Sequence, residues 1–230
     1  MKRTAFLVLP LAALLFMAAP LFAQTQYRLD LYGAGSIPLD KDFTITVPQS
    51  TTPLDGTHDF SPGFRGGIRV GADGRGHWGQ DLDYSYGSIP SKISVPPGDE
   101  FSITNRTHQF SYNVLWYPGG AQSSKKKVFP YLTAGAGAVI FQVSKSAKND
   151  AMEAGLGTLL DHTTFAFNAG GGIRVRINNI YGFRIDVRDV MSHPVRYGIP
   201  AESSDPATFV FPVTGIFHQI QFSVAFNYYF

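Results

Sequence analysis

The sequence predicts an all-β protein, an eight-stranded antiparallel up-and-down transmembrane β-barrel. Residues 219–230 alternate apolar with mostly polar side chains at period two, which indicates a strand whose two faces meet different solvents. Eight segments of about ten residues share this period, and no long window has helical periodicity. The connections between them alternate between long and short, as in barrels with tight turns on one side of a membrane and long loops on the other.

The first residues predict a cleaved signal peptide. Lys2 and Arg3 precede an apolar stretch from Ala5 to Ala19, and Ala23 then offers a small residue suited to cleavage just before Gln24. Prolines interrupt this stretch, and it is shorter than the roughly 20 residues that a membrane-spanning helix needs. We therefore expect two parts, a signal peptide at 1–23 and an outer-membrane barrel domain at 24–230.

Charge and cysteine content exclude several classes of function. Two of the 19 lysine and arginine residues lie in the leader, so the remainder balances the 17 aspartate and glutamate residues, and no basic surface for nucleic acid is expected. The chain has no cysteine. Disulfides, thiolate metal sites, cysteine nucleophiles and a lipoprotein anchor are thereby excluded.

Turn chemistry supports the division into strands. Residues 72–76 contain Asp-Gly and 177–179 contain Asn-Asn, which suit tight hairpin turns. Most prolines, Pro90 among them, fall in the predicted long connections, where they interrupt no strand ladder. An even number of strands puts both termini on one side of the membrane. The predicted strands are 25–35, 61–71, 77–87, 106–117, 130–143, 163–176, 181–189 and 217–230.

Every second residue of these strands is apolar, so each strand has one apolar face, and we assign that face to lipid. Segment 130–143 is apolar or small on both faces, so alternation does not decide its orientation. Aromatic residues at the strand ends nearest the termini predict an interfacial girdle. Its members are Tyr27, Trp78, Trp116, Tyr131, Tyr181, Tyr228 and Phe230.

The opposite parity carries charge. Seven arginines and four aspartates, with no lysine, share the predicted luminal face. An eight-stranded barrel has an interior just wide enough for side chains, so these groups must pair in a narrow polar core. We interpret this core as a plug, and the alternative is a lumen that conducts ions. The predicted luminal charge network is Arg28, Asp30, Arg65, Arg69, Asp81, Asp83, Arg174, Arg176, Arg184, Asp186 and Arg188.

These features resemble the OmpA-like outer-membrane β-barrel superfamily. The resemblance rests on residues 130–137, residues 183–188 and the terminal Phe230, and it extends over the whole mature chain. It implies export to the cell outer membrane, contact with outer-membrane lipid and lipopolysaccharide, and recognition by the barrel assembly machinery. The outward row of the last strand, which would carry the assembly signal, is Phe222, Val224, Phe226, Tyr228 and Phe230.

The resemblance does not choose a function, because members include membrane anchors, adhesion proteins, small pores and a few lipid-modifying enzymes. The six histidines show no metal-ligand spacing, and we expect no catalytic, metal or cofactor site. His108 and Ser111 come nearest to a serine–histidine pair, but their strand parity is opposite. We expect a non-enzymatic barrel with a structural or surface-interaction role through its long loops, especially 36–60 and 190–216, whose extracellular ligand is not identified. The alternatives are a narrow pore for ions or small solutes and, third, a lipid-modifying enzyme.

Overall fold

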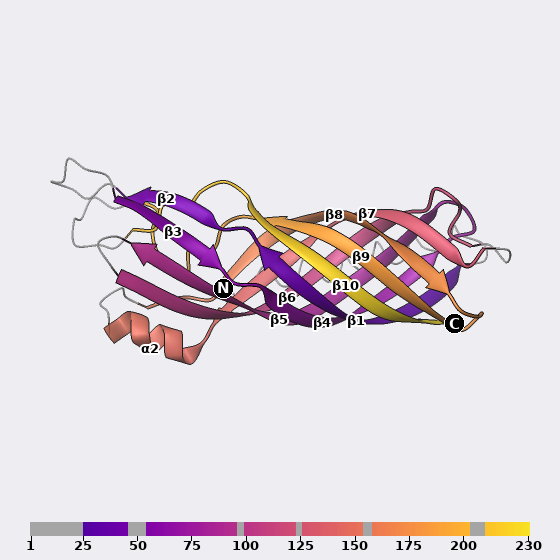
Figure 1. Ribbon diagram of the computed structural model, residues 1–230, viewed down its shortest axis with the longest axis horizontal. Coiled ribbons are helices and arrows are strands. Elements are labelled where there is room, and N and C mark those ends of the chain that lie inside the picture. Colours follow the sequence, from indigo (N-terminus) through magenta and orange to yellow (C-terminus); the bar gives the residue numbers. More distant parts are fainter. Residues whose placement is uncertain (1–24, 46–53, 96–98, 123–125, 154–157, 203–209) are drawn as a thin grey trace, which may run out of the picture.

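The computed structural model describes residues 25–45, 54–95, 99–122, 126–153, 158–202 and 210–230 (Figure 1). The predicted signal peptide at 1–23 lies outside these residues. The described chain forms one antiparallel sheet that closes on itself, because β1 pairs with both β4 and β10, and β5 pairs with β6. The closed ring confirms the predicted eight-stranded barrel.

Six of the eight wall strands follow the predicted segments to within three residues, and two, β5 and β6, are longer than predicted. Each wall strand lies beside the next one along the chain. In chain order they are β1 (Gln26–Pro38), β4 (Gly63–Asp73), β5 (Trp78–Val95), β6 (Asp99–Trp116), β7 (Val128–Val143), β8 (His162–Arg176), β9 (Tyr181–Ser192) and β10 (Phe217–Tyr229).

The ends of the barrel differ. One end, here called the turn end, holds the start of β1, the end of β10 and the short connections. The opposite end, here called the loop end, carries the long connections (Figure 1). Two further strands, β2 (Lys41–Ile45) and β3 (Leu54–Phe60), pair with each other at the loop end. Of the two, β3 also pairs with residues 91–94 of β5. A helix, α2 (Lys145–Glu153), lies between β7 and β8, and the Ser144 hydroxyl caps it by accepting the Ala147 N–H at 3.2 Å.

The prediction of a loop over residues 88–105 was wrong. Strands β5 and β6 continue as a paired hairpin as far as Val95 opposite Asp99. Pro90 lies inside β5, and its carbonyl accepts the Ser61 N–H at 2.9 Å. Apolar and polar residues still alternate here, as in Phe101-Ser102-Ile103-Thr104, but the prolines of this stretch had placed it in a long connection.

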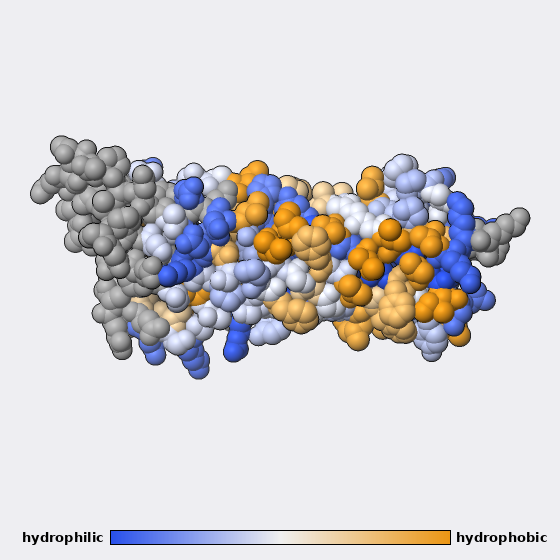
Figure 2. All heavy atoms as spheres, in the orientation of Figure 1, coloured by the Kyte–Doolittle hydropathy of each residue, from blue (hydrophilic) through white to orange (hydrophobic). Residues whose placement is uncertain are grey.

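The outer wall carries the predicted apolar face. Phe64 is 70% exposed and Leu31 is 64% exposed, although both are large and apolar. Figure 2 shows hydrophobic residues gathered over the part of the visible face nearer the turn end. The structure also settles the orientation of β7, because Leu132 is exposed whereas Tyr131 and Thr133 are buried. Placing Tyr131 in the girdle was therefore wrong, since its side chain points into the barrel.

An apolar core fills the interior at the loop end. Its members come from strands β5 to β10, from α2, from the connection between α2 and β8, and from the β9–β10 connection. The connection supplies Val195, Tyr197, Phe211 and Val213, each at most 2% exposed. Loop 190–216 was predicted to be a surface loop. Its described part instead packs into the mouth of the barrel. No helix among the described residues is long and apolar enough to cross a membrane.

Candidate functional site

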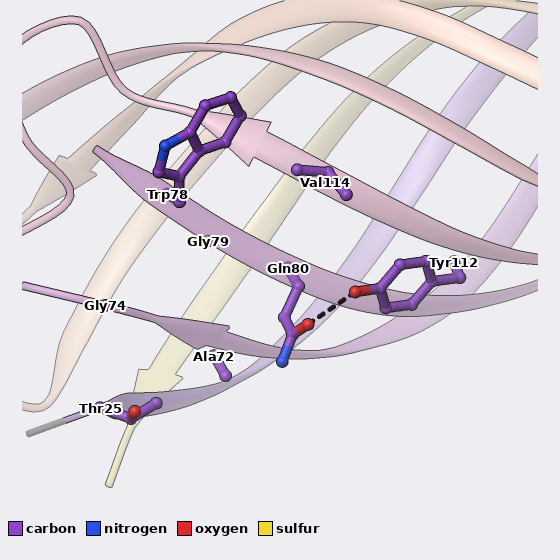
Figure 3. A pocket seen from close by; sticks show the side chains of 8 residues that line it. All are labelled: Thr25, Ala72, Gly74, Trp78, Gly79, Gln80, Tyr112 and Val114. Carbon is purple, nitrogen blue, oxygen red and sulfur yellow. Dashed lines mark hydrogen bonds between the residues drawn. The ribbon is translucent and has the colours of Figure 1, made fainter. Parts of the chain in front are cut away.

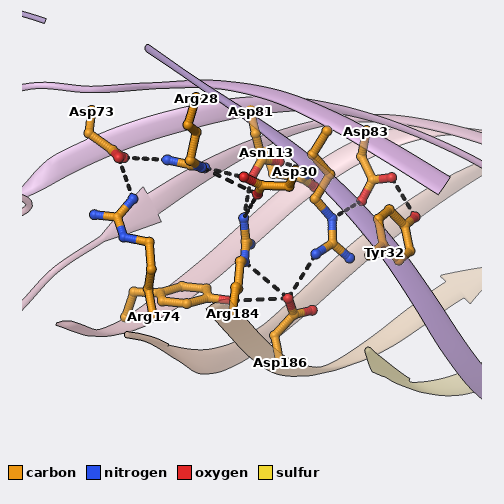
Figure 4. A network of polar contacts seen from close by, with 12 residues as sticks. Arg28, Asp30, Tyr32, Asp73, Asp81, Asp83, Asn113, Arg174, Arg184 and Asp186 are labelled. Carbon is orange, nitrogen blue, oxygen red and sulfur yellow. Dashed lines mark hydrogen bonds and ion pairs between the residues drawn. The ribbon is translucent and has the colours of Figure 1, made fainter. Parts of the chain in front are cut away.

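Strand register brings opposite charges together on the inner wall in the half nearer the turn end. On neighbouring strands Asp30 lies opposite Arg69, and Arg69 lies opposite Asp83. Successive side chains of a strand point to opposite faces, so these side chains point into the barrel while their sequence neighbours face lipid. We call the resulting ionic network the charged core; Figure 4 shows much of it.

The part of the charged core nearest the turn end is organised around Asp73. Its Oδ1 accepts Arg28 Nη1 at 2.6 Å and the Tyr117 hydroxyl at 3.1 Å, and its Oδ2 accepts Arg174 Nη1. Asp73 is fully buried. The sequence analysis missed it because Asp73 precedes Gly74 at a turn, although it shares the parity of Arg69.

Arg184 forms the centre of the network. Its Nη1 donates to Asp30 Oδ2 at 3.1 Å and to Asp81 Oδ2 at 2.9 Å (Figure 4). Arg28 approaches the same two carboxylates from the opposite side, at 3.3 and 3.1 Å. Two arginines thus share two aspartates, and the contacts join β1, β5 and β9 through the interior.

Asp186 and Asp83 form the part nearest the loop end. Asp186 accepts Arg69 Nη1 at 2.9 Å, Arg188 Nε at 3.0 Å and the Tyr131 hydroxyl at 3.0 Å, and Arg184 Nε lies 3.1 Å away. Asp83 accepts Arg69 Nε at 2.7 Å. Since Arg69 lies on β4 and Asp186 on β9, the Arg69–Asp186 pair spans the lumen.

Ten of the eleven predicted luminal residues are buried, and Arg176 is half-buried. Arg176 donates to Gln26 at the turn end. Arg65 is 1% exposed but makes its hydrogen bonds to neutral groups, Gln109 and Thr107. The structure therefore brings nine of the eleven into one ionic network and leaves these two beside it.

Tyrosines and glycines complete the charged core. Arg69 lies 3.9 Å above the ring of Tyr32, whose hydroxyl donates to Asp83 at 2.6 Å. A Cβ built on Gly71 would lie 2.6 Å from Arg28 Nη2, so only glycine leaves room for that guanidinium group. The sequence did not predict the luminal tyrosines, because aromatic rings were assigned to the outer wall.

The β6–β7 connection covers the charged core at the turn end. Tyr117, Ala121 and Phe129 are buried in a small cluster, and the Ala121 carbonyl accepts Arg174 Nη2 at 3.0 Å. The interior consequently has three levels along the barrel axis. A covering cluster at the turn end is followed by the charged core and then by the apolar core.

The outer wall carries a hollow of about 160 Å³ near the turn end. Small residues such as Ala72 and Gly79 form part of it, and Trp78 stands at its edge (Figure 3). Within it Tyr112 donates a hydrogen bond to Gln80 at 2.6 Å, which satisfies the hydroxyl on a face that is otherwise largely apolar.

The chemistry of the described residues points to structural ion pairing. Ser111 is buried inside the barrel, whereas His108 lies on the outer face and bonds Tyr84 through Nδ1 at 3.0 Å. These two residues therefore cannot act together. Within the described ranges, no group of three histidine, aspartate or glutamate side chains is arranged to hold a metal ion.

Comparison with known families agrees with this architecture. The model of the outer membrane protein beta-barrel domain matches residues 9–230. The chain belongs to this family. Membership places the outer membrane protein beta-barrel domain of this chain in the outer membrane, in agreement with the sequence analysis. None of the curated proteins matches the sequence.

Solved structures include similar barrels. OprG of Pseudomonas aeruginosa is 13% identical with a TM-score of 0.56, and the match covers 91% of this chain and 97% of OprG. Neisserial surface protein A is 10% identical with a TM-score of 0.49, covering 90% of this chain and all of that one. The outer membrane protein AlkL is 13% identical with a TM-score of 0.48, covering 91% and 92%. At these identities the likeness to OprG establishes the fold of the domain alone.

Proposed function

We propose that this protein is a non-enzymatic outer-membrane barrel with a closed lumen, acting through the surface at its loop end in a structural or surface-interaction role. The observation that carries the proposal is the Arg69–Asp186 contact across the lumen between β4 and β9, set in a network of buried ion pairs. The apolar core adds a second obstruction. An ion crossing the barrel would have to separate buried charges and then pass closely packed apolar side chains.

The alternative is a narrow pore, and single-channel conductance of the folded mature protein in a planar bilayer distinguishes the two. We expect no discrete openings from protein whose folding is verified by the mobility difference between boiled and unboiled samples on a gel. Reproducible openings from the wild-type protein would refute the closed lumen.

Removal of two luminal arginines sharpens the test. Arg69→Ala combined with Arg174→Ala should lower the stability of a closed barrel and leave it silent. In a pore the same change should raise conductance or alter ion selectivity, because both side chains lie in the lumen. A variant of the exposed Arg106, Arg106→Ala, controls for the loss of a positive charge.

The third alternative, a lipid-modifying enzyme, has no support from the positions of His108 and Ser111. Incubation of folded protein with outer-membrane lipid, including lipopolysaccharide, should yield no released acyl chain. If acyl release occurs and is lost in His108→Ala, the non-enzymatic proposal fails.

We also infer that residues 1–23 direct export and that the assembly machinery reads the outward row of β10. This row is exposed along the strand and ends in Phe230 at 65% exposure. Deletion of Phe230 should reduce insertion in cells and leave refolding in detergent nearly unchanged. Equal losses in both assays would instead assign Phe230 to barrel stability.

A further inference from the structure

The buried charges of the interior do not balance. The described wall strands bury six luminal arginines and five luminal aspartates. The arginines are Arg28, Arg65, Arg69, Arg174, Arg184 and Arg188; the aspartates are Asp30, Asp73, Asp81, Asp83 and Asp186. A buried charge without a counter-ion is costly, so the one surplus positive charge needs an explanation.

The surplus is located at Arg65. Its Nη1 donates to Gln109 Oε1 and its Nη2 to Thr107 Oγ1 at 2.9 Å, and both acceptors are neutral. Its Nε is buried and has no hydrogen-bond partner in the part of the chain that the structure describes. Within the described residues, no carboxylate lies at ion-pair distance from its guanidinium group. By contrast, each of the other five buried arginines contacts at least one aspartate.

The surroundings of Arg65 offer donors and few free acceptors. Gln109 Oε1 already accepts from Gln221 Nε2 at 3.0 Å in addition to Arg65, so both of its lone pairs are used. Gln221 Nε2 also donates to Gln219 Oε1 at 3.1 Å. Opposite Gln221 in the strand register stands Arg188, whose Nη2 is likewise buried without a partner.

We propose that the interior binds one small monovalent anion against Arg65 Nε, at the boundary between the charged core and the apolar core. The ligand chemistry is that of a halide or a small carboxylate, because Arg65 offers an unpartnered N–H and one net positive charge. The surplus charge is then neutralised in place. Arg176, which has no carboxylate partner among the described residues either, is half-buried at the turn end, where water can solvate it. The proposal holds whether or not the lumen conducts.

The first test measures thermal unfolding of the full mature barrel in detergent. The quantity determined is the temperature at which half of the protein has lost the gel mobility of the folded form. Sodium chloride, sodium acetate and sodium gluconate are compared at equal ionic strength. At about ten times the dissociation constant, chloride or acetate should raise this temperature by roughly 3–6 °C relative to gluconate. Whichever salt gives the rise identifies the source of the anion; three equal curves would overturn the proposal.

Arg65→Met gives the sharper result. It removes the surplus charge, so the variant should unfold at a higher temperature than wild type in gluconate and should not respond to chloride or acetate. The matched control is Arg106→Met, which alters an exposed arginine and should retain the full response. If Arg65→Met unfolds earlier than wild type by the same margin in all three salts, Arg65 is structural and no anion is bound.

A second measurement applies even if Arg65→Met does not fold. Crystals of wild-type protein grown with sodium bromide should show anomalous scattering within hydrogen-bond distance of Arg65 Nε, and crystals grown with acetate should show a small carboxylate there. Ordered water in that position in both crystals would overturn the proposal.

Discussion

The charged core and the apolar core fill the same barrel but are built differently. Every charged residue of the charged core lies on a wall strand at inward parity, so its position follows from strand register. The apolar core depends in addition on the β9–β10 connection, which contributes Tyr197 and Phe211 from outside the wall. The interior of an eight-stranded barrel can thus be filled in two ways, by side chains of the wall strands or by a loop that folds back into the barrel.

The two fillings also differ in what they do for the fold. A buried ion-pair network contributes little net stability compared with apolar side chains of equal volume, but removal of one partner is strongly destabilising. It therefore favours one register, because a shift by one residue would turn every charge toward lipid. The apolar core stabilises by burial and tolerates changes of shape better.

The largest effect should come from Asp186→Asn, which breaks the charged core. Asp186 lies within ion-pair distance of three arginines, and the neutral amide leaves all three without that charge. We expect the free energy of unfolding to fall by about 3–5 kcal/mol, measured by urea titration in lipid vesicles with the fluorescence of the two tryptophans. Asp161→Asn, at an exposed pair with Lys148, should cost less than about 1 kcal/mol. Equal losses would show that burial does not distinguish the two sites.

The apolar core should break locally. Phe211→Ala leaves a cavity among buried side chains and should destabilise the loop end by about 3 kcal/mol. Hydrogen exchange of residues 193–202 and 210–217 should accelerate, while the folded mobility on a gel stays unchanged. Ile216→Ala, at a 53% exposed side chain of the same segment, is the control and should have little effect. Loss of the folded band in Phe211→Ala would mean that the two cores form one cooperative unit.

A smaller effect is expected from overfilling the charged core. Gly71→Ala would place a methyl group against the Arg28 guanidinium and should cost about 1–3 kcal/mol. Gly66→Ala on the same strand meets nothing closer than 3.8 Å and is the matched control. The difference in urea midpoint between the two variants measures how tightly the charged core is packed. Equal midpoints would indicate that the Arg28 side chain shifts to accommodate the added methyl group.

The smallest effect is a dependence on pH at the loop end. His58 packs against Phe60 and Phe211, with ring centroids 4.1 and 5.4 Å away, and burial lowers its pKa from 6.5 to about 3. A lowered pKa in the folded state means that the stabilisation is complete above pH 6.5 and is lost as the pH falls toward 3. Between pH 7 and 5.5 we expect a loss of about 1 kcal/mol in the β2–β3 region.

Hydrogen exchange of β3 at both pH values measures this loss, and His58→Phe should abolish it. The lowered pKa of the Asp161 carboxyl, held down mainly by the hydrogen bond from Lys148, has its effect only below about pH 4, outside this window. An unchanged response in His58→Phe would assign the pH dependence to another group.

The sequence predicted those features that follow from the alternation of apolar and polar residues along a strand. The wall strands, the outward face and the buried charges at inward parity could be read from period two, because that period places side chains directly. Asp73 was missed since a glycine follows it, and Tyr131 was misassigned because β7 is apolar on both faces. The β2–β3 hairpin and the packing of Tyr197 and Phe211 depend on contacts between distant segments. Tyr197 even adopts a positive φ of 54°, which only the tertiary structure can impose.

The Asp30–Arg184 pair has a consequence for assembly. Asp30 lies on β1 and Arg184 on β9, and β10 stands between these strands in the wall. The pair can form only when β10 has joined β1 and the cylinder is shut. An open sheet during insertion would lack this contact, and each residue could keep only pairs such as Asp30 with Arg28 and Arg184 with Asp186, which lie within one strand. The final pairing of strands therefore completes the ionic contacts. Closure of the barrel is thereby favoured, because its last step forms an ion pair that the open sheet cannot form.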